Sequence, residues 1–162
     1  MSNYLLAIDP GNLESGIVIM DTETFEPKYK AKISNENAEI VCRDAFIQEA
    51  VIEMVASYGM PVGETVFETC VAIGRFEQIL EARGIPVRRI KRKEVKMNLC
   101  GRATAKDSNI AQALVDRFAP GERNHGKGTK KEPGFFYGFK ADIWQAFALG
   151  VTYIDKGFVV NW

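Results

Sequence analysis

The first strand of the chain places the strongest limit on what it can fold into. Residues Leu5 to Ile8 are consecutive apolar residues, which predicts a strand buried on both faces in a sheet that helices cover. Asp9 ends this strand, and Pro10 and Gly11 follow it as a turn. A buried carboxylate costs free energy without a partner, so Asp9 either caps the turn or binds a ligand at the sheet edge.

Apolar patterns and turn residues divide the rest of the chain into strands and helices. Strands are expected at residues 14–21, 27–34, 64–69 and 85–90, and helices at residues 38–58, 73–82, 109–118 and 140–154. The strand at 27–34 carries alternating lysines, which favours an edge position in the sheet. The order predicts an α/β fold in a single domain, with a five-stranded mixed sheet flanked by helices. The glycine-rich, basic segment 119–134 is expected to be a flexible loop.

Composition sets the class of protein. The chain has 162 residues, of which 46% are hydrophobic and 26% charged, as in an ordinary soluble domain. It contains no apolar run of membrane-spanning length, and its N-terminus lacks the pattern of a signal peptide. The cysteines, Cys42, Cys70 and Cys100, are far apart, and the single histidine lies in a polar loop. These features argue against a zinc site and favour reduced thiols in a cytosolic protein.

The net charge of zero hides a division between the two halves of the chain. Residues 1–82 carry 14 Asp and Glu against 5 Lys and Arg, whereas residues 83–162 carry 7 against 16. Such a division suggests that the second half faces a polyanion. The basic stretch begins at Arg88 and continues to Lys106.

Three acidic residues occur where expected elements end or begin. Asp9 ends the first strand, Glu68 ends the expected strand at 64–69, and Asp142 lies in the first turn of the last expected helix. If the fourth strand pairs with the first, Asp9 and Glu68 are neighbours, and the last helix can bring in Asp142. Carboxylates this close raise one another's pKa unless a cation binds them, and Mg²⁺ prefers such oxygen ligands. The alternative for Asp142 is a helix N-terminus, where acids are favoured by the helix dipole.

The chain resembles the RuvC family of Holliday-junction resolvases, which has the RNase H-like fold, and most of all the versions carried by bacteriophages. The resemblance rests, in chain order, on Ala7–Gly11 with Ser15-Gly16, on Phe67-Glu68, on Lys106–Ser108, and on Lys140–Asp142 with Ala146–Leu149. It implies a metal-dependent endonuclease that cuts Holliday junctions and other branched DNA, acting as a homodimer that makes two symmetric nicks. It also implies Mg²⁺ as the cofactor, with Mn²⁺ as a candidate substitute, and the cytoplasm of a phage-infected bacterium as the location.

The resemblance assigns metal-binding roles to particular residues. The family uses an Asp on strand one, a Glu on strand four, and two residues three apart on the last helix. Asp9 and Glu68 match the first two positions, and Asp142 with Gln145 matches the helix pair. Gln145 stands where the family usually has an acid, and its side chain could still hold a water at the metal. If Asp142 takes the later of the two helix positions, Phe139 takes the earlier one and cannot ligate a metal. In either register Asp107 is a candidate substitute ligand, although helix capping explains it better.

The resemblance also assigns the nucleic-acid contacts. Basic residues near the fifth strand and the following helix hold the DNA backbone in the family, and these positions are filled by Lys91, Arg92, Lys93, Lys96, Arg102 and Lys106. The family places an aromatic residue shortly after the strand-four Glu to disturb base stacking. Val71 stands at that position here, so Phe76 or the Phe135–Tyr137 run is the candidate, unless that run belongs to the core.

Two other functions fit parts of the sequence. A junction-binding protein that has lost catalysis would explain Gln145 in place of an acid. A sugar-kinase or actin-like ATPase also has an Asp-Pro-Gly turn before a hairpin, but its fold needs two domains of this kind, which 162 residues do not provide.

Overall fold

The chain forms one five-stranded sheet with helices on both faces, in a computed structural model that describes residues 2–161. The strands are β1 (Tyr4–Asp9), β2 (Glu14–Asp21), β3 (Pro27–Ser34), β4 (Glu49–Met54) and β5 (Val87–Lys91), and the helices are α1 (Asn35–Asp44), α2 (Glu64–Ala82), α3 (Arg92–Cys100), α4 (Asp107–Phe118) and α5 (Asp142–Asp155). The strands lie in the order β3-β2-β1-β4-β5. β1 is antiparallel to β2 and parallel to β4, so the expected mixed sheet is confirmed.

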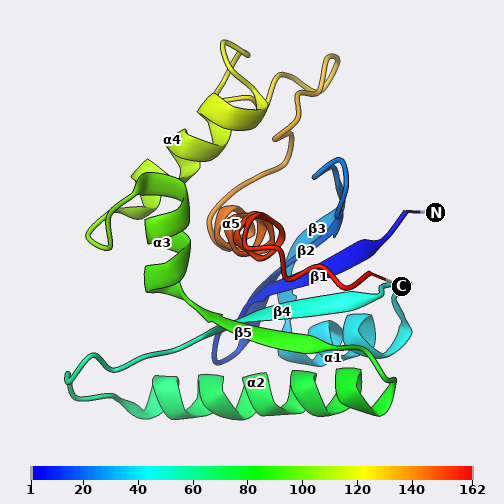
Figure 1. Ribbon diagram of the computed structural model, residues 1–162, viewed down its shortest axis with the longest axis vertical. Coiled ribbons are helices and arrows are strands. Elements are labelled where there is room, and N and C mark those ends of the chain that lie inside the picture. Colours follow the sequence, from blue (N-terminus) through cyan, green and yellow to red (C-terminus); the bar gives the residue numbers. More distant parts are fainter. Residues whose placement is uncertain (1, 162) are drawn as a thin grey trace.

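The two faces of the sheet have separate cores. Helices α1 and α2 cover one face, where Leu6, Ile8 and Ile52 pack against Phe76 and Leu80 of α2. Helix α5 covers the other face, with α3 and α4 packed beside it (Figure 1). Because side chains alternate along a strand, odd-numbered residues of β1 face α5 and even-numbered residues face α2. None of the helices within residues 2–161 is long and apolar enough to cross a membrane.

The prediction for residues 38–69 is wrong in its details. The expected helix at 38–58 ends as α1 at Asp44, because Ala45 turns to an extended backbone, and β4 follows. The expected strand at 64–69 is the beginning of α2, where the Thr69 hydroxyl donates to the Thr65 carbonyl oxygen at 2.8 Å. A short apolar run suits a strand or a helix equally well, and packing decides between them. The strand that pairs with β1 is therefore at 49–54 and not at 64–69.

Helix α5 is fixed to the sheet by small residues and by a buried acid. A methyl group at Gly150 would lie 2.3 Å from the Met20 sulfur, so a side chain at this position would require the Met20 side chain or the helix to move. Near the C-terminal end of α5, the Tyr153 hydroxyl donates to the buried Glu49 carboxylate on β4 at 2.6 Å. These contacts of Gly150 and Tyr153 with the sheet therefore help to fix where the first turn of α5 lies.

The aromatic run before α5 belongs to the core. Phe136 is fully buried and packs against Phe139, Trp144 and Phe147, whereas Tyr137 is 40% exposed. The segment 119–134 is irregular, and one bridge between Gly128 and Pro133 closes its tip. Its flexibility stays a prediction.

Candidate active site

The register of the sheet places charged residues in one row where β1 and β4 end, and we call this the active end of the sheet. Asp9 pairs with Gly16, Gly16 pairs with Lys32, and Glu53 follows the last registered residues of β4 opposite β1. Neighbours in a row point to the same face of a sheet, and here this is the face that α5 covers. Lys32, Asp9 and Glu53 therefore lie on three strands at one end of one face.

Helix α5 brings Asp142 directly above this row. A methyl group added at Gly16 would lie 2.6 Å from the backbone oxygen of Asp142 and 2.9 Å from its Cβ. Only a glycine leaves space for the first turn of the helix at this point. The predicted convergence of Asp9 and Asp142 is consistent with this packing.

Gly16→Ala is expected to push the start of α5 away from β2. We expect the free energy of unfolding to fall by about 1–3 kcal/mol, the usual cost of overpacking a tight contact. Denaturant unfolding checks this result. Gly74→Ala is the matched control, because Gly74 is an exposed residue of α2 with nothing within 4 Å of an added methyl group. The control should gain about 0.5–1 kcal/mol from helix propensity, and an unchanged stability of Gly16→Ala would refute the tight contact.

The neighbouring acids of the site affect the protonation of Asp9. Burial, the charge of Glu53, a hydrogen bond with Glu53 and the charge of Asp142 together raise the pKa of Asp9 from 3.8 to about 9. Arg92 acts in the opposite direction. Without a bound cation, Asp9 therefore holds a proton at neutral pH, and its ionisation requires additional positive charge nearby.

Two basic side chains supply part of that charge. The Lys32 ammonium group lies 2.9 Å from Asp142 Oδ2, and the Arg92 guanidinium group lies 3.4 Å from Glu53 Oε1. Arg92 also donates to the carboxylate of Asp107 in the first turn of α4. Within residues 2–161, no three acidic, histidine or cysteine side chains are already arranged tightly enough to enclose a metal ion.

The chemistry of the site nevertheless fits a hard divalent cation. Asp9, Glu53 and Asp142 offer carboxylate oxygens, which Mg²⁺ prefers. Gln145 is one turn after Asp142 on α5, and its Oε1 atom is buried with no hydrogen-bond partner in the described part of the chain. A buried polar atom without a partner is costly, and a ligand or water at the site would satisfy it.

The predicted position of Glu68 at the end of the fourth strand is wrong. Glu68 is exposed on α2, which packs on the opposite face of the sheet from Asp142. Its carboxylate accepts a hydrogen bond from the Asn12 side chain at 3.3 Å, beside a groove between α1 and α2. The carboxylate next to Asp9 is that of Glu53. The sequence contains a signal for it, because Ala50 to Ile52 are apolar and an acid follows, as in β1.

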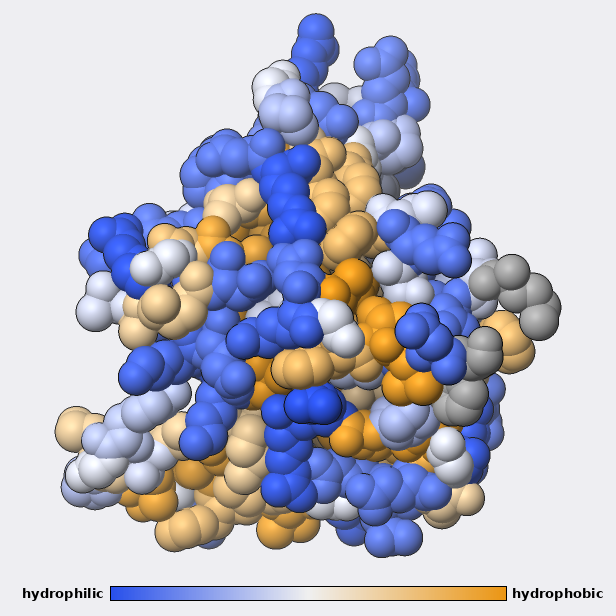
Figure 2. Space-filling model, in the orientation of Figure 1, coloured by the Kyte–Doolittle hydropathy of each residue, from blue (hydrophilic) through white to orange (hydrophobic). Residues whose placement is uncertain are grey.

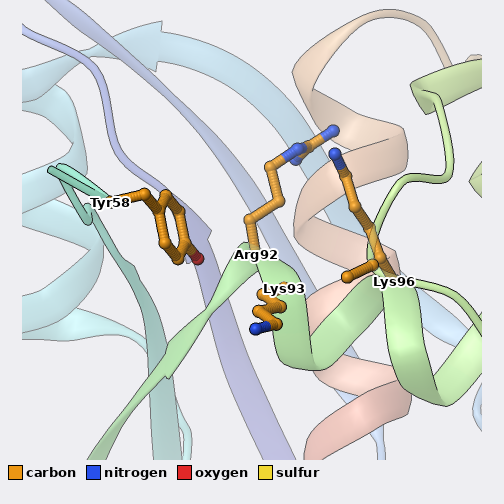
Figure 3. Close-up of a pocket in the computed structure, with 5 residues that line it drawn as sticks. Tyr58, Arg92, Lys93 and Lys96 are labelled. Carbon is orange, nitrogen blue, oxygen red and sulfur yellow. The ribbon is translucent and has the colours of Figure 1, made fainter. Parts of the chain in front are cut away.

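Half of the predicted DNA-contact residues line one groove beside these acids. Arg92, Lys93 and Lys96 of α3, together with Tyr58 and Ala103, surround a groove of about 310 Å³. Figure 3 shows the Tyr58 ring on one side of Arg92 and Lys96 on the other side. The Arg92 and Lys96 side chains both extend toward the top of this view. The remaining predicted residues, Lys91, Arg102 and Lys106, are exposed and do not line this groove.

Tyr58 is a residue that the sequence prediction missed. It lies in the loop between β4 and α2, its side chain is 63% exposed, and its φ of 48° is in the left-handed region. The prediction placed the aromatic residue relative to Glu68, which led to Val71 and Phe76. Phe76 is fully buried in the core under α2. Counted from Glu53, the exposed aromatic residue that follows is Tyr58.

Comparisons with known proteins identify the fold. No family model and no curated protein matches the sequence. Among solved structures, the chain is similar to RuvC of Thermus thermophilus, with a TM-score of 0.67 and 15% identity over 95% of this chain and 96% of that chain. It is also similar to T. thermophilus RuvC in complex with a Holliday junction substrate, with a TM-score of 0.70 and 13% identity over 96% of this chain and 94% of that chain. The chain therefore has the RNase H-like fold of RuvC over nearly its whole length.

Proposed function

We propose that this protein is a metal-dependent endonuclease that cleaves Holliday junctions and other branched DNA. The observation that carries the proposal is the row of acids at the end of β1 and β4, beneath Asp142 of α5, next to a groove lined by basic residues. The likeness of the fold to a RuvC solved with a junction supports the choice of substrate.

The acidic residues, Gln145 and the basic residues of the site would have separate roles in hydrolysis. Asp9, Glu53 and Asp142 would hold Mg²⁺, with Mn²⁺ as a candidate substitute, and Gln145 would orient a water through its Oε1 atom. When bound, the metal would activate a water for attack on a phosphodiester and stabilise the charge that develops there. Arg92, Lys93 and Lys96 would hold the DNA backbone, with Lys91, Arg102 and Lys106 adding charge around the groove.

A labelled four-way junction tests the proposal directly. The protein should convert it into nicked duplexes in the presence of Mg²⁺ and leave it intact when EDTA removes the metal. Linear duplex of the same sequence is the control substrate and should stay uncut. A junction that is bound but never cut, with Mg²⁺ or Mn²⁺, would overturn the proposal.

A junction-binding protein without catalytic activity is the second candidate. The observation that favours it is Gln145, a neutral side chain where the resemblance leads one to expect an acid. The same assay separates the two functions, because the second candidate binds the junction and does not cut it at any metal concentration.

We propose that the protein acts as a homodimer, since two symmetric nicks match the symmetry of a pair. Figure 2 shows apolar side chains gathered over the beginning of α2 and the loop before it. The exposed apolar residues of this region include Met60 (70%), Phe67 (60%) and Val71 (64%). An exposed apolar patch on a soluble protein is typical of an interface. Sedimentation velocity tests this, and a monomer at concentrations that support cleavage would contradict it.

Tyr58→Ala is expected to lower cleavage of the junction by about 10-fold, because loss of one base-stacking contact removes about 1–3 kcal/mol. Tyr58→Phe keeps the ring and should cleave like the wild type. Tyr137→Ala is the matched control, since Tyr137 is also exposed but lies outside the groove. The fluorescence of a 2-aminopurine placed at the crossover reports unstacking of the bases when the protein binds. A fluorescence rise with Tyr58→Ala equal to that with the wild type would refute a stacking role.

A further inference from the structure

Lys32 is a cation of the active end that lies outside the basic stretch of the sequence. It is on the edge strand β3, two strands away from Asp9 in the same row of the sheet. Gly16 lies between them and has no side chain. The Lys32 side chain can therefore extend over β2, and its ammonium group lies 2.9 Å from Asp142 Oδ2.

This ion pair contributes little to stability. The Lys32 and Asp142 side chains are 40% and 39% exposed, and ion pairs at such positions are worth about 0–1 kcal/mol. An ammonium group has three N–H donors, and Asp142 is its one ion-pair partner within residues 2–161. Donors therefore remain available to a ligand in the site.

The charge balance of the site suggests which ligand this is. Arg92 lies between Glu53 and Asp107, so two carboxylates already balance its charge even where it contacts the DNA backbone. Gln145 carries no charge, which leaves the α5 side of the site with one carboxylate to hold a cation. A scissile phosphate brought to this end adds negative charge, and Lys32 is the basic side chain that already reaches it from β3.

We propose that Lys32 donates a hydrogen bond to the phosphate that the site cleaves. Its positive charge takes the place of cation charge that Gln145, which is neutral, cannot help to hold. This inference rests on the proposed nuclease function and adds a catalytic residue to it. The role is a hydrogen bond and a positive charge, and no bond to Lys32 forms or breaks. Such a fixed donor stabilises the charge that develops on the phosphate during the reaction.

The test compares Lys32→Gln, Lys32→Arg and Lys30→Gln in single-turnover cleavage of a four-way junction at saturating Mg²⁺. Lys30 is the matched control, because it is on the same strand and the same face but lies 5.9 Å from the Phe139 ring instead of beside an acid. Lys32→Gln should lower the cleavage rate roughly 10- to 100-fold, which is somewhat less than the loss expected on removing a buried donor. Lys32→Arg should recover most of the rate, and Lys30→Gln should cleave like the wild type.

Junction affinity, measured with Ca²⁺ in place of Mg²⁺, is the second readout. It should change less than threefold in Lys32→Gln, because one backbone contact among several contributes little to binding.

The alternative role for Lys32 is only to neutralise Asp142. In that case its removal frees the Asp142 carboxylate, so the cleavage rate of Lys32→Gln at low Mg²⁺ would rise or stay the same. That result, or a rate for Lys32→Gln within twofold of the wild type at saturating Mg²⁺, would overturn the inference. Absence of cleavage by the wild-type protein would instead overturn the proposed function.

Discussion

Asp9→Asn is expected to abolish junction cleavage while junction binding is retained. Loss of a central carboxylate removes several kcal/mol of charge stabilisation, and about 1.4 kcal/mol corresponds to a tenfold change in rate, so we expect a loss of about 1,000-fold. Single-turnover cleavage and a gel-shift titration measure the two effects. Asp116→Asn is the control, since Asp116 is exposed on α4 and pairs with Gln112. Cleavage by Asp9→Asn at the wild-type rate would end the assignment.

The same substitution should stabilise the metal-free protein. Asp9 has a pKa of about 9 when folded and an ordinary value of 3.8, so above pH 4 the unfolded chain loses a proton that the folded chain keeps. The wild-type protein therefore loses stability as the pH rises from about 4 to 9. Asp9→Asn has no such titration and should be more stable at pH 7 by up to roughly 4 kcal/mol. Denaturant unfolding in EDTA at pH 5 and pH 8 checks this, and parallel pH profiles for the two proteins would contradict it.

Glu53→Gln and Glu68→Gln are expected to differ by about 1,000-fold in cleavage, although both remove one negative charge. Glu53 lies beside Asp9 on the face that α5 covers, whereas Glu68 is exposed on α2, which packs on the other face. Glu53→Gln should therefore be inactive, and Glu68→Gln should cleave within twofold of the wild type. The two variants control for each other in charge and in residue type. An inactive Glu68→Gln beside an active Glu53→Gln would return the role to Glu68.

The sequence predicts the parts of the site that local chemistry determines. Asp9 follows a run of four apolar residues and precedes Pro10 and Gly11, which leaves a strand end as its position. The first three strands and their order in the sheet were predicted in the same way. For Asp142, the apolar residues of α5 define a helix whose first turn it occupies.

Packing determines the remaining parts. The residues Ala50 to Ile52 are too few to distinguish a strand from the continuation of α1, whereas Val66 and Phe67 suit a strand and yet begin a helix. The choice depends on pairing with β1, which is a contact between residues far apart in the chain. Lys32 could not be recognised at all from local sequence, because its place beside Asp142 depends on the register of β2 and β3.

The convergence of Asp9, Glu53 and Asp142 on one cation is the central claim, and the anomalous scattering of Mn²⁺ in crystals of the protein tests it most directly. We expect an anomalous peak within coordination distance of carboxylate oxygens of all three residues, about 2.0–2.3 Å away. The same peak should be absent from crystals of Glu53→Gln. A peak at Glu68, or crystals in saturating Mn²⁺ with no peak between these three acids, would contradict the account.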